Sequence, residues 1–137
     1  MHCPASNRRQ CKSDILIMKK KVKFSIGGRL RSFKYAANGL KILFSQEHNA
    51  RIHAVAAVMA VSLAIILGFD RTGWVAVLIS IAAVFITESV NSAVERLCDL
   101  VMPQYSRQVK EIKDLAAGAV LISAVMAVLL WITVSLT

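Results

Sequence analysis

Three long apolar stretches constrain this chain more than any other feature. They cover residues 52–69, 74–94 and 115–136, and each is close to the roughly 20 residues that an α-helix needs to cross a bilayer. Backbone groups inside a membrane have no water to bond, so only helices and closed β-barrels span it. The stretches lack the alternation of barrel strands. The sequence therefore predicts an all-α integral membrane protein with transmembrane helices at about 50–69, 74–99 and 114–136.

The charge of the chain is separated from its apolar stretches. The formal net charge is +9, and twelve of the seventeen Lys and Arg residues lie within residues 1–51. A basic segment ahead of apolar spans is typical of a membrane protein that contacts anionic lipid. Nucleic-acid binding is the alternative, but no zinc-finger spacing, helix-turn-helix or RNP-like motif accompanies the charge. We therefore expect one membrane domain and no nucleic-acid partner.

The first part of the chain lies outside that expected domain. Residues 1–28 are predicted to be a basic, flexible extension, and residues 29–137 the membrane domain. The segment 1–23 does not resemble a secretory signal, because its only apolar stretch, residues 15–18, is too short. The spacing of Cys3 and Cys11 matches no common zinc pattern, and with Cys98 on a predicted helix the three cysteines indicate no disulfide framework.

Residues 29–46 form a different kind of element. Apolar side chains recur at helical spacing at Leu30, Phe33, Ala37, Leu40 and Phe44. Another side of the same helix carries Arg31, Lys34, Asn38 and Lys41. This pattern predicts an amphipathic helix that lies on the membrane surface. Packing against a further protein domain is the alternative, for which the chain offers no candidate.

The distribution of Lys and Arg also predicts the orientation of the spans. Sixteen basic residues lie before the first span or in the loop 96–113, which share one side, and only Arg71 lies in the connection on the other side. The basic side faces the cytoplasm in most membrane proteins. The N-terminus is therefore predicted inside and the C-terminus outside, with Trp74 and Trp131 near the outer interface.

A polar stripe interrupts the second span. Its members are Glu88, Asn91, Glu95 and Asp99. At about 100° per residue these positions stay within roughly 60° of one line along a helix, and Ser92 flanks that line. Counting about 20 residues inward from Trp74 places Glu88 at membrane depth. A carboxylate at that depth costs a few kcal/mol and is usually functional. The alternative is a buried residue that holds helices together by hydrogen bonds.

Two further ionic clusters lie at the same predicted depth. Glu47, with His53 nearby, stands before the first span, and Lys113 and Asp114 stand before the third. Carboxylate and amide oxygens are ligands suited to magnesium that also binds nucleotide phosphates. Phosphoryl transfer requires positioning, charge neutralisation and a base, and a carboxylate withdrawn from water suits that base. No Walker-type loop and no protein-kinase motif set is present in the sequence.

The motifs resemble those of a known family. Glu88-Ser-Val-Asn-Ser-Ala-Val-Glu-Arg-Leu-Cys-Asp99, then Lys113-Asp-Leu-Ala-Ala-Gly118, looks like the core of the prokaryotic diacylglycerol kinase and undecaprenol kinase family. The segment 32–40 is similar to the surface helix of that family. The segment 47–53 is similar to the start of its first transmembrane helix. The resemblance implies a homotrimer in the bacterial cytoplasmic membrane, with sites shared between neighbouring chains. It also implies ATP-dependent phosphorylation of a lipid hydroxyl, with diacylglycerol or undecaprenol as acceptor.

The resemblance implies a role for each candidate residue. Glu88 would be the general base on the lipid hydroxyl, with Asn91 close to it. Glu47 and Glu95 would hold the Mg²⁺ that bridges the ATP phosphates. The residues implied at the nucleotide are Arg31, Tyr35, Asp99, Lys113 and Asp114.

Some positions depart from the family pattern. Ser106 stands where the family often has a histidine, and His53 stands where some relatives carry an acid, which slightly favours undecaprenol as the acceptor.

Two other functions remain open from the sequence. A small cation or proton conductor could use a carboxylate stripe, although the outer halves of the spans are apolar. A structural membrane subunit is the other, and it offers no use for Glu88.

Overall fold

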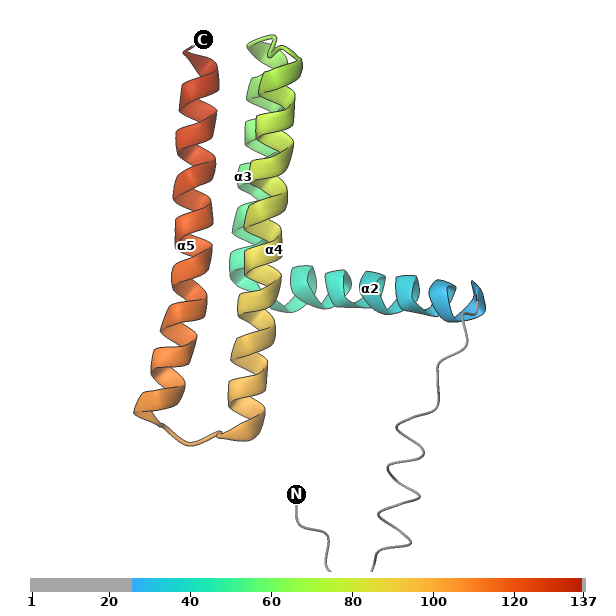
Figure 1. Ribbon diagram of the computed structural model, residues 1–137, viewed down its shortest axis with the longest axis vertical. Helices are drawn as coiled ribbons and strands as arrows, with labels where there is room; N and C mark the ends of the chain where they lie inside the picture. Colours follow the sequence, from blue (N-terminus) through green and yellow to red (C-terminus); the bar gives the residue numbers. More distant parts are fainter. Residues whose placement is uncertain (1–25, 137) are drawn as a thin grey trace, which may run out of the picture. The chain divides into compact units, whose positions relative to one another are not determined.

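The computed structural model describes residues 26–136, which are helical apart from short connections (Figure 1). The helices are α2 (Ile26–Gln46), α3 (His48–Ile66), α4 (Arg71–Val101) and α5 (Arg107–Ser135). Helices α3, α4 and α5 are long and apolar enough to cross a membrane, which confirms the predicted fold class. The chain divides into two units, residues 1–37 and 38–137. Cys3, Cys11 and the predicted extension up to residue 25 lie outside the described residues.

The connection between α3 and α4 lies three residues earlier than the sequence predicted, at residues 67–70 instead of 70–73. Helix α3 ends in a Schellman motif, in which Gly68 adopts φ 67° and the Phe69 N–H donates to the Ala64 carbonyl at 3.0 Å. Asp70 then caps α4, since its side chain accepts from the Gly73 N–H at 2.8 Å. Residues 71–73, expected in the connection, are therefore the first turn of α4.

Helices α4 and α5 both continue beyond the predicted apolar spans. Helix α4 ends at Val101 and α5 begins at Arg107, so that only residues 102–106 connect them. Pro103 in this connection has no N–H to continue a helix. Glu95 and Lys113 therefore lie within helices, and the backbone of each helix fixes the position of its own charged residues along the helix axis.

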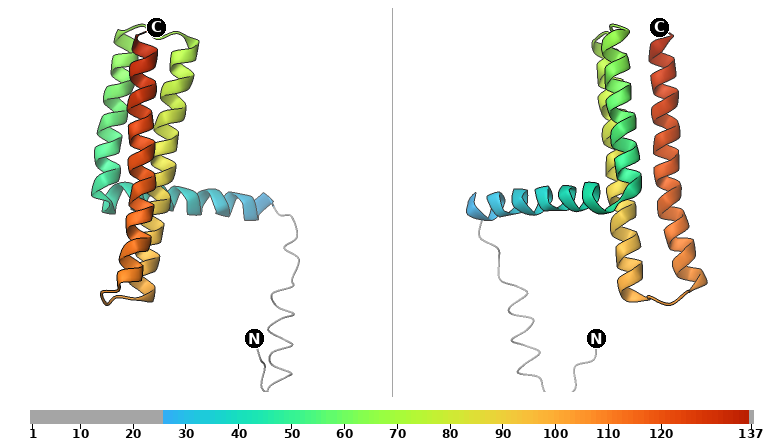
Figure 2. Two further views of the ribbon diagram at one scale, coloured as in Figure 1. Left: turned by 60° about the vertical axis from the view of Figure 1, so that its left-hand side comes forward. Right: turned by 180° about the vertical axis from the view of Figure 1, so that it is seen from behind.

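Helices α4 and α5 run antiparallel and side by side in all views (Figures 1 and 2). A hydroxyl pair joins them midway, with 2.8 Å between Thr87 Oγ1 and Ser123 Oγ. Helix α3 packs on α4 as well, and two of its alanines, Ala50 and Ala64, are fully buried. Small residues allow helices in a membrane to approach closely. Most large apolar side chains of the three helices point outward, as expected of a surface that contacts lipid.

Gly73 predicts a stability difference that can be measured. A Cβ at Gly73 would lie 2.8 Å from Val134 Cγ1 and 3.0 Å from Phe69 Cδ2, whereas a Cβ at Gly118 would meet nothing within 4 Å. Overpacking costs about 1–3 kcal/mol, and replacing a helical Gly with Ala gains about 1 kcal/mol. We expect Gly73→Ala to lower the thermal unfolding midpoint in detergent and Gly118→Ala to raise it. Equal shifts for both variants would contradict the close approach at Gly73.

Candidate active site

Three of the four buried polar side chains in the described part of the chain lie on the stripe of α4 or directly beside it. Glu88 is 2% exposed, Asn91 4% and Ser92 6%, and the fourth such residue, Ser80, lies about two turns away. The three lie within slightly more than one helical turn. Burying polar groups is costly unless they find partners. A cluster of them in an otherwise apolar helix therefore marks a candidate site.

Hydrogen bonds satisfy only part of this cluster. Asn91 Nδ2 donates to Glu95 Oε1 at 2.9 Å, which joins two residues of the predicted stripe. Three other atoms are buried without a protein partner: Glu88 Oε2, Asn91 Oδ1 and Ser92 Oγ. Buried polar atoms of folded proteins nearly always have partners. This turn therefore offers unused hydrogen-bonding capacity to a bound molecule.

Glu47 lies between α2 and α3 and is held by an arginine of α4. Arg96 approaches Glu47 Oε1 with Nη2 at 2.6 Å and with Nε at 3.2 Å. The same Nη2 donates to Gln46 Oε1 at 3.0 Å. These two contacts hold the carboxylate of Glu47 against the turn of α4 that contains Glu95 and Arg96.

The structure gathers the predicted acids of the first and second spans. Glu47, His53 and Glu95 all lie close enough to Glu88 to interact with it electrostatically. With Glu88 the group contains three carboxylates against one arginine, Arg96, and one histidine, so the site has an excess of negative charge. Such a site attracts a cation or a proton from the solvent.

A second group of charges links α4 to α5. Lys113 Nζ donates to Asp99 Oδ1 at 2.5 Å, and Lys113 also interacts electrostatically with Glu95. Glu95 therefore has charged neighbours in both groups. Asp114 instead pairs with Lys110 of its own helix, with 2.5 Å between Nζ and Oδ2. The structure thus brings Asp99 and Lys113 together and directs Asp114 to a different partner.

The two candidates of the surface helix belong to the first unit, residues 1–37. Arg31 Nε donates to the Gly27 carbonyl at 3.4 Å on the same helix. The Tyr35 side chain is largely exposed. Their contact with a nucleotide stays a prediction.

The carboxylates can be tested for their fit to a metal ion. Within residues 26–136, no three His, Cys, Asp or Glu side chains form a metal site by themselves. Magnesium bound with a nucleotide requires only one or two carboxylates, because phosphates and waters complete its shell. Glu47 and Glu95 fit this requirement, since Glu47 is bonded to Arg96, the residue next to Glu95 on α4. A cation at Glu47 would compete with Arg96, which already neutralises that carboxylate.

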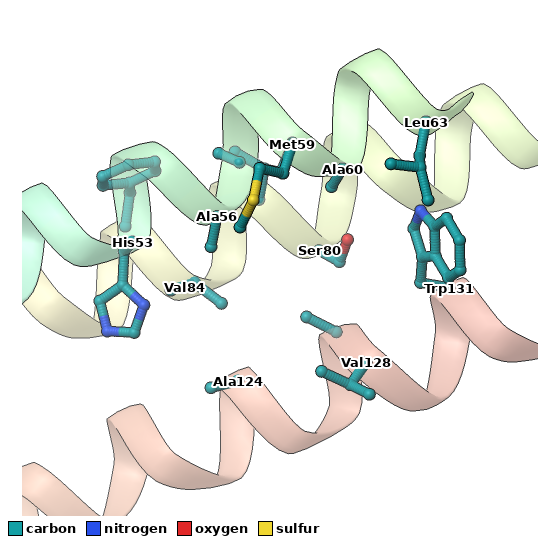
Figure 3. A pocket seen from close by; sticks show the side chains of 14 residues that line it. His53, Ala56, Met59, Ala60, Leu63, Ser80, Val84, Ala124, Val128 and Trp131 are labelled. Carbon is teal, nitrogen blue, oxygen red and sulfur yellow. The ribbon is translucent and has the colours of Figure 1, made fainter. Parts of the chain in front are cut away.

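A cavity of about 460 Å³ lies between α3, α4 and α5. Figure 3 shows His53 at one end of it and Leu63 and Trp131 at the other. Most of the lining between these ends is alanine and larger aliphatic or aromatic side chains, with Ser80 as a polar exception. Val84 also lines the cavity, and it lies one helical turn before Glu88 on α4, so the cavity reaches to within about one turn of the buried carboxylate. An apolar space of this size suits a hydrocarbon chain.

Sequence reasoning did not identify Arg96 as part of the site. Its partner Glu47 lies 49 residues away in the sequence, so no local pattern could indicate the pair. Ser92 was noted beside the stripe, but no role was assigned to it. Its lack of a hydrogen bond becomes visible only in the structure.

Comparison with known proteins gives consistent matches. The family described as prokaryotic diacylglycerol kinase matches residues 34–135. Diacylglycerol kinase of Synechocystis sp. is 36% identical over 101 residues, which cover 73% of this chain and 58% of that protein. Diacylglycerol kinase of Escherichia coli strain K12 is 31% identical over 102 residues, which cover 74% of this chain and 84% of that protein.

Undecaprenol kinase of Bacillus subtilis is 28% identical over 106 residues, which cover 77% of this chain and 86% of that protein. The chain thus spans less than two thirds of the Synechocystis protein and most of the other two. The family match includes all of α3, α4 and α5 and every residue of the polar stripe. The chain therefore belongs to the prokaryotic diacylglycerol kinase family.

Proposed function

We propose that this chain transfers the γ-phosphoryl group of ATP to the hydroxyl of a membrane lipid. Its relatives carry the names diacylglycerol kinase and undecaprenol kinase, and both names describe phosphorylation of a lipid alcohol. The acceptor is accordingly diacylglycerol, giving phosphatidic acid, or undecaprenol, giving undecaprenyl phosphate.

One observation carries this proposal beyond the family name. The buried, incompletely bonded turn that contains Glu88 lies one helical turn after Val84, which lines an apolar cavity. A lipid alcohol has the matching composition, with a hydrocarbon chain for the cavity and a hydroxyl for the polar turn. The mostly apolar lining beyond His53 disfavours a cation or proton path through the protein.

The proposed roles follow the chemistry of each group. Glu88 accepts the proton of the lipid hydroxyl, and Asn91 lies beside it. Glu47 and Glu95 hold Mg²⁺, which supplies charge neutralisation at the ATP phosphates when it is bound. The residues proposed to contact the nucleotide are Arg31, Tyr35, Asp99, Lys113 and Asp114.

The proposed setting is the bacterial cytoplasmic membrane, with the active site on the cytoplasmic side. The amphipathic helix α2 contacts the anionic phospholipid surface, and the C-terminus lies outside. The chain forms a homotrimer in which neighbouring subunits share the active sites. The family resemblance supports the trimer, and the distribution of Lys and Arg supports the direction of the spans.

A single assay tests the activity. Purified protein in detergent micelles would be incubated with magnesium and ATP labelled at the γ-phosphate, with either dioctanoylglycerol or undecaprenol added. We expect label to enter the organic phase with one of the two lipids and not without lipid. Absence of labelled lipid with both acceptors, from a folded protein, would contradict the proposal.

The orientation makes a separate prediction. Single cysteines placed at Arg71 and Gln108, in a chain whose own cysteines are replaced, would be labelled in intact cells with a membrane-impermeant reagent. We expect labelling at position 71 only, because residue 108 lies in the basic connection proposed to face the cytoplasm. Labelling of position 108 from outside would reverse the assigned direction.

A further inference from the structure

We propose that Ser92 orients the acceptor hydroxyl of the lipid by donating a hydrogen bond to its oxygen. This inference rests on the proposed lipid kinase function and adds a substrate-positioning residue to it. Ser92 is 6% exposed and lies one helical turn after Glu88.

Ser92 differs from the other hydroxyl residues of these helices. A serine or threonine in a helix ordinarily bonds to a carbonyl three or four residues earlier. The other buried or half-buried hydroxyl residues within α4 and α5 do so: Ser80, Thr87, Ser89 and Ser123. Ser92 Oγ has no such bond, although it is buried. Because an unpaired buried hydroxyl costs free energy, a bound molecule is the natural partner.

The unpartnered atoms of this turn differ in whether they can donate a hydrogen bond. An alcohol has a proton to give and an oxygen that accepts. Two of the unpartnered atoms of this turn, Glu88 Oε2 and Asn91 Oδ1, can only accept while the carboxylate is ionised. Ser92 Oγ is the one unpartnered atom of the turn that carries a proton. It is therefore the group that can bind the oxygen of the alcohol.

The spacing of the two residues allows one oxygen to bond to both. Side chains at positions i and i+4 of a helix have Cβ atoms about 5–6 Å apart. An alcohol oxygen bonded to both Glu88 and Ser92 would lie about 2.7–2.8 Å from each. The alcohol then gives its proton to Glu88 and accepts one bond from Ser92, so that a further lone pair is free to attack phosphorus.

The reaction step balances with Ser92 unchanged. The alcohol proton passes to the Glu88 carboxylate as the alcohol oxygen bonds to the γ-phosphorus. The bond from that phosphorus to the β–γ bridging oxygen breaks, and its electron pair leaves with ADP. Ser92 keeps its own proton throughout. Its contribution is the orientation of the alcohol rather than proton transfer.

The experiment compares Ser92→Ala with Ser89→Ala. Ser89 is a half-buried serine of the same helix that does not line the cavity, and its Oγ already donates to the Phe85 carbonyl at 2.7 Å. With whichever of dioctanoylglycerol and a short-chain polyprenol the wild type accepts, we expect Ser92→Ala to lower kcat/KM for the lipid about tenfold, as loss of one buried hydrogen bond implies. The KM for ATP should stay unchanged, and Ser89→Ala should resemble the wild type in both constants.

A second measurement separates orientation from packing. The analogue with hydrogen in place of the lipid hydroxyl should inhibit the wild type and Ser92→Ala with equal inhibition constants, because it cannot use the Ser92 bond. Equal lipid kinetics for Ser92→Ala and Ser89→Ala would overturn the inference, as would weaker binding of the deoxy analogue to Ser92→Ala. A folded wild type that phosphorylates neither lipid would instead overturn the proposed function itself.

Discussion

Glu88→Gln is expected to reduce lipid phosphorylation by about 10²-fold or more, the usual contribution of general acid–base catalysis. Glutamine has nearly the same size, but its amide cannot take the proton of the lipid hydroxyl. Nucleotide affinity should change little, because Glu95, proposed for the phosphate end, lies about two helical turns from Glu88 along α4, and Lys113 lies on α5. The loss should therefore appear in turnover and not in the binding of ATP.

The stability of this variant should not fall with its activity. Glu88 is 2% exposed and its Oε2 has no protein partner, so the native protein holds a carboxylate in a setting that suits an uncharged side chain better. Removing a charge from such a place relieves a desolvation cost, and active-site groups are commonly kept at the expense of stability. We expect the thermal unfolding midpoint of Glu88→Gln to equal or exceed that of the wild type.

Lipid-phosphate production, nucleotide affinity, oligomeric state and thermal unfolding midpoint should all be measured on the same purified preparation of Glu88→Gln. Glu111→Gln is the matched control. Its carboxylate is exposed and pairs with Arg107 of the same helix at 3.1 Å, a kind of contact that contributes about 0–1 kcal/mol. This control should retain activity. Retained catalysis in Glu88→Gln would leave Glu88 a structural residue, and lost nucleotide binding would move it to the metal site.

The number and type of the helices could be predicted because length and composition decide them. A run of about 20 apolar residues has few ways to bury its backbone groups in a membrane other than as a helix. The helix ends were predicted less well, since local contacts determine them. Asp70 starts α4 three residues earlier than expected by capping it, and α5 begins seven residues before the predicted span. Apolar composition indicates which residues lie inside the membrane, but it does not indicate where a helix begins or ends.

The stripe on α4 could be predicted because its members share one helix, and helical periodicity places them on one face. Contacts between helices could not be predicted in this way. The Arg96–Glu47 and Lys113–Asp99 pairs depend on how α4 lies against its neighbours. Sequence spacing carries no information on that arrangement. Sequence spacing likewise could not single out Ser92, because its distinguishing feature is that its buried Oγ has no hydrogen-bond partner.

Glu95→Gln is expected to lose activity to a similar extent for a different reason. Its carboxylate accepts from Asn91 Nδ2 at 2.9 Å, and a glutamine Oε1 can accept the same bond, so the fold of α4 should survive. The charge is lost, and with it the proposed hold on Mg²⁺. Glu47→Gln is a less clear test, because it would also leave Arg96 without its ion-pair partner.

The dependence on metal concentration distinguishes this variant from Glu88→Gln. Mutating a residue that hydrogen-bonds to a metal ligand typically weakens metal affinity about 10–100-fold. Loss of a ligand itself should therefore raise the half-saturating magnesium concentration by at least the same factor. High magnesium should restore part of the activity of Glu95→Gln and none of that of Glu88→Gln. Binding of Mn²⁺ in the presence of a non-hydrolysable ATP analogue should weaken in parallel. Wild-type turnover of Glu95→Gln at ordinary magnesium would remove Glu95 from the metal site.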